Sequence, residues 1–133
     1  RYAGLVERRL VEILDSYGLT RPGAPARVMS FSYVALNRVK KLAPDLEVVQ
    51  LAEKIYAWHL TKNLVEDDWI AGPGINLLRE NPRFRRRLAR SGRRVHVWTV
   101  NTVEDLELCR EMGVEAVITD RPARMLSHLR TCG

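Results

Sequence analysis

Three side chains that could contact a ligand stand where predicted strands end: Ser30, Phe31 and Trp98. In parallel α/β folds, ligands bind at the carboxyl ends of the strands, so these positions favour a binding role. The Ser30 hydroxyl needs a base to become a nucleophile, and the sequence places none beside it, so we expect Ser30 to support the strand end. His96 offers acid–base chemistry. It lies deeper along its strand than Trp98, and we expect it to be a hydrogen-bonded interior residue.

The nearest candidates for a metal site are the carboxylates Glu53, Asp67 and Asp68. A hard cation needs several oxygens that converge on it, and neighbours in an extended chain point in different directions. We therefore expect no metal site from these residues. Asp120 follows the last predicted strand, where it can approach a ligand or cap the helix that begins near Pro122, and we favour the cap.

Strand-like and helix-like segments alternate along the chain. Helical periodicity covers residues 2–17 before the first strand, and it recurs between the later strands, with Ser32 and Thr102 as predicted N-caps and a break at Pro82. Predicted strands cover residues 27–31, 46–51, 68–71, 95–100 and 114–119.

Repeated strand–helix units of about 30 residues imply parallel pairing and an α/β fold. Two architectures fit this pattern. One is the last five strand–helix units of a TIM (β/α)₈ barrel, incomplete because a whole barrel needs roughly 200 residues or more. The other is an autonomous doubly wound five-stranded sheet. The leading helix, with no strand before it, favours the incomplete barrel.

Composition is that of an ordinary globular domain, with 46% apolar and 29% charged residues among 133, and no apolar run is long enough to span a membrane. Two cysteines make no disulfide framework, which favours a reduced, cytoplasmic setting. The formal charge of +6 comes largely from arginine. Arginines cluster over residues 83–94, where we expect Phe84 and Leu88 to pack one side of a helix and leave the arginines on the other. No stacking aromatic residues interleave with the arginines on that outer face, so we expect a solvated helix face and no nucleic-acid binding.

Several segments, taken in order, resemble the glycerophosphodiester phosphodiesterase family. They are RYAGLVERRLVEILDSYGL at 1–19, VMSFS at 28–32, VHVWTVN at 95–101 and ITDRP at 118–122. The resemblance implies a (β/α)₈ barrel of which residues 1–133 form a partial domain, from the third helix through the eighth strand–helix unit. It also implies hydrolysis of glycerophosphodiesters to glycerol 3-phosphate and an alcohol, usually with a divalent cation, Ca²⁺ or Mg²⁺.

The family keeps its acid–base and metal-binding residues in the first three strand units, and none of those motifs occurs here. We therefore expect no catalytic or metal-binding residue in this chain, and a chain that is inactive alone. By the resemblance, Trp98, Phe31 and Ser30 line the substrate pocket, with Trp98 packed on the glycerol group. An alternative is an inactive, truncated barrel that self-associates through its open edges or pairs with an N-terminal partner.

Overall fold

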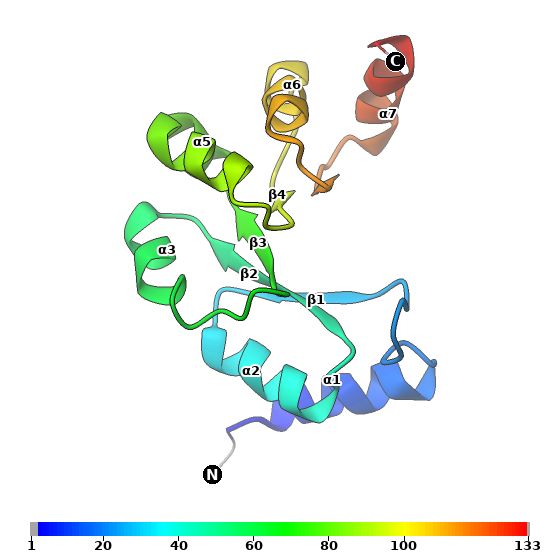
Figure 1. The fold of residues 1–133 in the computed structure, drawn as a ribbon. Helices are drawn as coiled ribbons and strands as arrows, with labels where there is room; N and C mark the ends of the chain where they lie inside the picture. The colour runs from blue at the N-terminus through cyan, green and yellow to red at the C-terminus, as the bar shows by residue number, and fades with distance from the viewer. Residues whose placement is uncertain (1–2, 133) are drawn as a thin grey trace.

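The structure, a computed structural model, describes residues 3–132 as alternating helices and parallel strands (Figure 1). The helices begin with α1 (Leu5–Ser16), which packs against α2, and end with α7 (Pro122–Cys132). In chain order the other elements are β1 (Arg27–Ser30), α2 (Tyr33–Leu42), β2 (Glu47–Ala52), α3 (Ile55–Thr61), β3 (Ile70–Pro73), α4 (Ile75–Glu80), α5 (Pro82–Arg90), β4 (His96–Val97), α6 (Val103–Met112) and β5 (Ala116–Val117).

The strands lie side by side in the order of the chain. β1 pairs with β2, β2 with β3, and β4 with β5, all in parallel. Single bridges from Ala71 to Val95 and from Gly74 to Trp98 connect β3 to β4. The helices lie along one side of this curved array (Figure 1). A doubly wound sheet would reverse its strand order and carry helices on both faces. The fold is therefore a partial (β/α)₈ barrel, and the doubly wound alternative is wrong.

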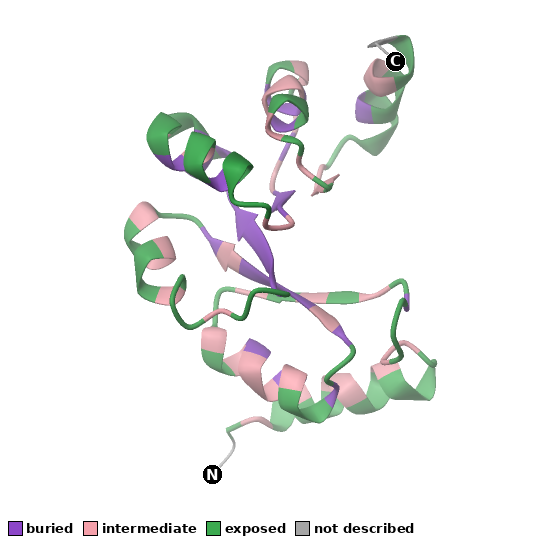
Figure 2. Ribbon diagram, viewed as in Figure 1, coloured by how far each residue is buried: buried purple, intermediate pink, exposed green. Residues whose placement is uncertain are grey.

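Apolar side chains on the helix side of the strands form two buried clusters. The smaller one joins α2 to the start of β2 through Leu36, Val39 and Val48. The larger one lies beneath α4 to α7 and includes Ala71, Leu78, Phe84, Leu88, Val97, Val100, Leu106 and Met125. Figure 2 shows β3 buried along its length while the outer helix faces are exposed. No helix within residues 3–132 is long and apolar enough to cross a membrane.

Local signals in the sequence set several of the helix ends. Ser32 and Thr102 cap α2 and α6 by accepting hydrogen bonds from backbone N–H groups three residues on, as predicted. Gly113 ends α6 with a φ of 71°, a conformation that glycine adopts without steric cost. The predicted break at Pro82 separates α4 from α5, with Pro82 in the first turn of α5.

The strand predictions need three corrections. β3 begins at Ile70, two residues later than predicted, while β4 and β5 are much shorter than the predicted ranges 95–100 and 114–119. Beyond β4 the backbone makes single hydrogen bonds to the chain after β3 and to Ile118, so the regular ladder stops. Regular alternation over residues 95–100 would put Val100 on the same face as Trp98, but Val100 packs in the helix-side cluster with Val95 and Val97.

Candidate functional site

Two aromatic side chains meet at the carboxyl ends of the strands. Phe31 directly follows β1, and Trp98 directly follows β4. Their ring centroids lie 5.6 Å apart with the planes at 88°, an edge-to-face contact. Phe31 remains 56% exposed, so the pair presents open apolar surface. We call this pair the aromatic corner.

Trp98 is held in place by the backbone of β3. Its Nε1–H donates to the carbonyl oxygen of Gly72 at 2.8 Å. The indole lies so close to Gly74 that an added Cβ there would be 3.2 Å from its Cζ2 atom. Gly74 therefore gives Trp98 room to lie flat against the strand end, a close approach that a side chain would obstruct.

The strand end that carries Phe31 is braced from β2. The Ser30 hydroxyl oxygen accepts a hydrogen bond from the Ser32 N–H at 3.0 Å, so Ser30 supports the turn, as expected. The buried Gln50 amide donates through Nε2 to the Phe31 carbonyl at 3.0 Å and to the Ser30 carbonyl at 3.4 Å. Sequence reasoning missed Gln50. The available signal was a polar residue in the apolar run from Val48 to Leu51.

Polar side chains connect the ends of β4 and β5. Asn101 accepts hydrogen bonds from the Thr119 hydroxyl and from the Asp120 N–H, and it donates through Nδ2 to the Asp120 carboxylate at 3.0 Å. The Thr119 hydroxyl oxygen accepts from the Arg121 N–H. The side-chain acceptor at the start of α7 is thus Thr119, one residue before the predicted Asp120.

The candidate carboxylates do not converge. Asp67 and Asp68 precede β3, at the amino ends of the strands, and they pair with Arg93 at 3.8 Å and Lys40 at 3.7 Å. Glu53 follows β2, at the opposite end of the sheet. Within residues 3–132 no group of three His, Cys, Asp or Glu side chains could hold a metal ion. The described residues therefore offer no donor set for a divalent cation.

An ion network occupies the amino ends of the strands. Arg94 pairs with both Glu47 and Glu115, and Arg27 pairs with Glu47 at 3.2 Å. The Arg94 guanidinium holds the pKa of both carboxyls below their usual value. His96 is buried and lies 2.7 Å from the Glu115 carboxylate, which confirms its interior role. Networks at this end of a barrel stabilise the fold, while ligands bind at the other end.

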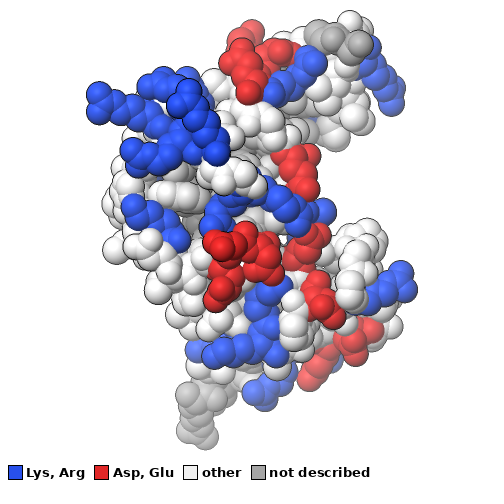
Figure 3. All heavy atoms as spheres, in the orientation of Figure 1, with Lys and Arg blue, Asp and Glu red and all other residues white. Residues whose placement is uncertain are grey.

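The arginine cluster covers the outer face of α5. Figure 3 shows Lys and Arg side chains gathered over this helix. Phe84 and Leu88 on the same helix are buried, as predicted. Arg85 and Arg93 donate to backbone carbonyl groups. The absence of nucleic-acid binding stays a prediction.

Residues 2–124 match the sequence model of the Glycerophosphoryl diester phosphodiesterase family. The chain belongs to this family. A Mycobacterium tuberculosis protein named "Probable glycerophosphodiester phosphodiesterase 1" is 34% identical over 133 residues, which cover 97% of this chain and 48% of that protein. The chain thus spans about half the length of the curated relatives it matches.

Solved structures of glycerophosphodiester phosphodiesterases share the fold. One from Parabacteroides distasonis superposes with a TM-score of 0.72 at 22% identity, covering 94% of this chain and 50% of its own. An Oleispira antarctica phosphodiesterase in complex with the product sn-glycerol-3-phosphate superposes with a TM-score of 0.69 at 20% identity, and the match covers 96% of this chain and 51% of that protein. The partial barrel predicted from the resemblance is therefore confirmed, while the ligand roles of Trp98, Phe31 and Ser30 stay predictions.

Proposed function

We propose that this chain forms the substrate-pocket part of a glycerophosphodiester phosphodiesterase, which hydrolyses its substrate to glycerol 3-phosphate and an alcohol. Family membership supports the reaction class. The observation that carries the proposal for this chain is the aromatic corner, because it stands where ligands bind in (β/α)₈ barrels. The product complex of the Oleispira antarctica relative supports glycerol 3-phosphate as the group bound.

In this proposal Trp98 forms the wall of the glycerol side of the pocket. Its indole is fixed by the Gly72 carbonyl and by contact with Phe31, so its ring face can pack against the C–H groups of glycerol without reordering. Phe31 extends the apolar wall. Ser30 contributes by holding the strand end that carries Phe31, through the hydrogen bond that its hydroxyl oxygen accepts from the Ser32 N–H.

The family's expected divalent cation, Ca²⁺ or Mg²⁺, does not fit the residues described. Ca²⁺ takes several carboxylate and carbonyl oxygens, and Mg²⁺ needs near-octahedral oxygen ligands. At the carboxyl ends of the strands the described carboxylates are Glu53 and Asp120, and Asp120 already accepts from Asn101. We therefore assign no step through a cation to this chain, and we expect the metal-binding and acid–base groups to come from the first three strand units of a complete barrel.

The test is release of glycerol 3-phosphate from glycerophosphocholine in the presence of Ca²⁺ or Mg²⁺. The chain is assayed alone and mixed with the N-terminal half of the Mycobacterium tuberculosis relative. We expect release only from the mixture, and a shift of the Trp98 indole N–H resonance when glycerol 3-phosphate is added. Release by the chain alone would contradict the expected inactivity. No release in either sample, with an unshifted Trp98 resonance, would overturn the proposal.

A second candidate is a non-catalytic chain that self-associates. Strand alternation places Met29 and Phe31 on the face opposite the helices, and both are exposed, at 43% and 56%. In the described part of the chain β1 and β5 pair with other strands on one side only, so their outer edges are free to pair with another chain. Size-exclusion chromatography with light scattering distinguishes the candidates. A stable, compact monomer would argue against association.

A further inference from the structure

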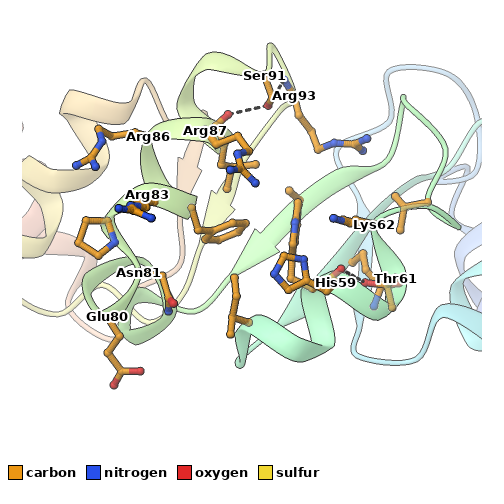
Figure 4. Close-up of a pocket in the computed structure, with 18 residues that line it drawn as sticks. His59, Thr61, Lys62, Glu80, Asn81, Arg83, Arg86, Arg87, Ser91 and Arg93 are labelled. Carbon is orange, nitrogen blue, oxygen red and sulfur yellow. Dashed lines mark hydrogen bonds between the residues drawn. The ribbon is translucent and has the colours of Figure 1, made fainter.

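A cavity of about 720 Å³ lies between α3 and α5, on the helix side of the sheet (Figure 4). Gln50 and Ala71, which are register partners on β2 and β3, belong to its lining. The aromatic corner does not line it. Its volume falls within the range of roughly 300–1,000 Å³ typical of small-molecule sites. The cavity is therefore a second place where a ligand could bind, independent of the proposed glycerophosphodiester site.

The walls of this cavity are apolar and partly aromatic. Trp58 from α3 meets Phe84 from α5 with ring centroids 5.0 Å apart and planes at 64°. Ile55 and Leu88 extend the same walls. Because Phe84 and Leu88 belong to the larger buried cluster, this surface is fixed by the core of the fold. Such walls favour a ligand with a flat or apolar body.

Basic side chains stand at the cavity rim. Arg83 and Arg87, four residues apart on α5, lie on one face of the helix, and on the opposite side lie His59 of α3 and Lys62, which directly follows α3 (Figure 4). Within residues 3–132, no ion pair joins Arg83, Arg87 or Lys62 to an acidic side chain. The acidic lining residue Glu80 points its carboxylate away from these arginines. The rim therefore favours an anionic group.

The lining also contains a buried acceptor that needs a donor. Gln50 is 2% exposed, and its Oε1 atom has no hydrogen-bond partner among the described residues. Its Nε2 atom donates to the carbonyl groups of Ser30, Phe31 and Leu51, which fixes the orientation of the amide. An unpaired buried acceptor is costly, so an N–H or O–H group reaching it would be favoured.

We propose that this cavity binds an aromatic anion of nucleotide size. Its ring would lie against Trp58 and Phe84, an N–H or O–H group on the ring would reach Gln50, and its phosphate or carboxylate would meet Arg83 and Arg87. A fatty acid would leave the Gln50 acceptor unpaired. A free phosphate would leave the apolar walls empty. The combination of donor, ring and anion satisfies all three features of the cavity.

The test is isothermal titration calorimetry of the full chain with AMP, which carries an amine on a purine ring and a phosphate. We expect saturable one-to-one binding that weakens as salt is raised, because the rim arginines are exposed. In ¹H–¹⁵N spectra, the indole resonance of Trp58, assigned with Trp58→Phe, shifts on binding. The Trp98 resonance stays in place, which separates this site from the aromatic corner.

Matched variants and ligands locate the contacts. The double variant Arg83→Glu, Arg87→Glu should weaken AMP binding at least about tenfold. Arg90→Glu changes the charge of the same helix, but Arg90 does not line this cavity, so its Kd should stay within about twofold. Purine riboside 5′-monophosphate, which lacks the amine, should bind about two- to tenfold more weakly.

Three outcomes would overturn the proposal: no saturable AMP binding, decanoate or inorganic phosphate binding as tightly as AMP, or equal weakening by the Arg90→Glu variant and by the Arg83, Arg87 double variant. None of these measurements depends on glycerophosphodiester hydrolysis. The cavity and the proposed function can therefore fail separately.

Discussion

Alanine substitutions at Gly72 and Gly74 test how closely β3 approaches its neighbours. At Gly74 the neighbour is the Trp98 ring of the aromatic corner, and at Gly72 the neighbours are side chains of β2. A Cβ at Gly74 would lie 3.2 and 3.3 Å from two atoms of the Trp98 ring, closer than the ordinary contact range of 3.4–4 Å. A Cβ at Gly72 would lie 2.7 Å from Val49 Cγ1 and 2.8 Å from Leu51 Cδ2. Both substitutions overpack the barrel interior, and the second does so more severely.

The expected magnitudes follow from what can move. Overpacking a core lowers the free energy of unfolding by about 1–3 kcal/mol. Replacing glycine by alanine restricts the unfolded chain, which offsets about 0.4–1 kcal/mol of that loss in both variants. At Gly74 the Trp98 ring must move a few tenths of an ångström, so we expect a loss of stability at the low end of the overpacking range. At Gly72 two side chains must move, and the Gln50 carbonyl oxygen lies 3.2 Å from the new Cβ. We therefore expect the free energy of unfolding of Gly72→Ala to be about 1–2 kcal/mol lower than that of Gly74→Ala.

Urea denaturation followed by far-UV circular dichroism measures this difference. Asn63→Ala, at an exposed position, serves as the control and should stay within about 0.5 kcal/mol of the parent. Gly74→Ala should also shift the Trp98 indole resonance, since the ring must move. If the two glycine variants have equal stability, or if Gly74→Ala leaves the Trp98 resonance unchanged, the close approach inferred from the structure is refuted.

Three further predictions concern catalysis, pH and cysteine reactivity. In the active mixture, Trp98→Ala should reduce turnover of glycerophosphocholine far more than turnover of bis(p-nitrophenyl) phosphate; equal losses would indicate a structural role. Arg94 lowers the pKa of Glu115 in the folded state, so the pair stabilises the fold above the unfolded pKa near 4.5, and this stability is lost as pH falls through the folded pKa. Glu115→Gln should reduce the loss of stability between pH 5 and roughly pH 3, by at most about 1 kcal/mol because Glu115 is partly exposed. Burial raises the pKa of Cys109 to about 12, so in a Cys132→Ser background its thiol should react with Ellman's reagent only as fast as the chain opens.

The controls for these predictions use the same measurements. A pH–stability curve of Glu115→Gln that coincides with that of the parent would show that the pair contributes nothing. Reaction of Cys109 at the rate of an exposed thiol, in a chain whose circular dichroism spectrum is native, would contradict its burial.

The alternation of elements could be predicted from the sequence because its signals are local. Periodicity, the caps at Ser32 and Thr102 and the break at Pro82 each act within one or two turns of chain. The length of β4 could not be predicted in this way. An apolar run from Val95 to Val100 has the pattern of a strand, but the extent of regular pairing depends on neighbours that are distant in sequence.

The same limit applies to the site. The strand-end rule placed Phe31 and Trp98 at the same end of the barrel, and the structure brings their rings into contact. The rule could not find Gln50, because its role depends on the carbonyl groups of a neighbouring strand. It also could not choose between Thr119 and Asp120 at the start of α7. That choice was decided by Asn101, which engages both residues from the adjacent strand end.

The two ends of β4 explain why residues two positions apart in the sequence have different roles. His96 lies within the ion network at the amino ends, where it shares a hydrogen bond with the Glu115 carboxylate, and Arg94 donates to the same carboxylate. Trp98 reaches the carboxyl ends, where its one polar atom is satisfied by Gly72 and its ring remains partly exposed. A buried histidine at the amino ends of the strands lies away from the end where ligands bind, so it is poorly placed to exchange protons with a substrate. An anchored, partly exposed aromatic ring at the ligand-binding end can contact a substrate, and this difference is why the proposed function depends on Trp98.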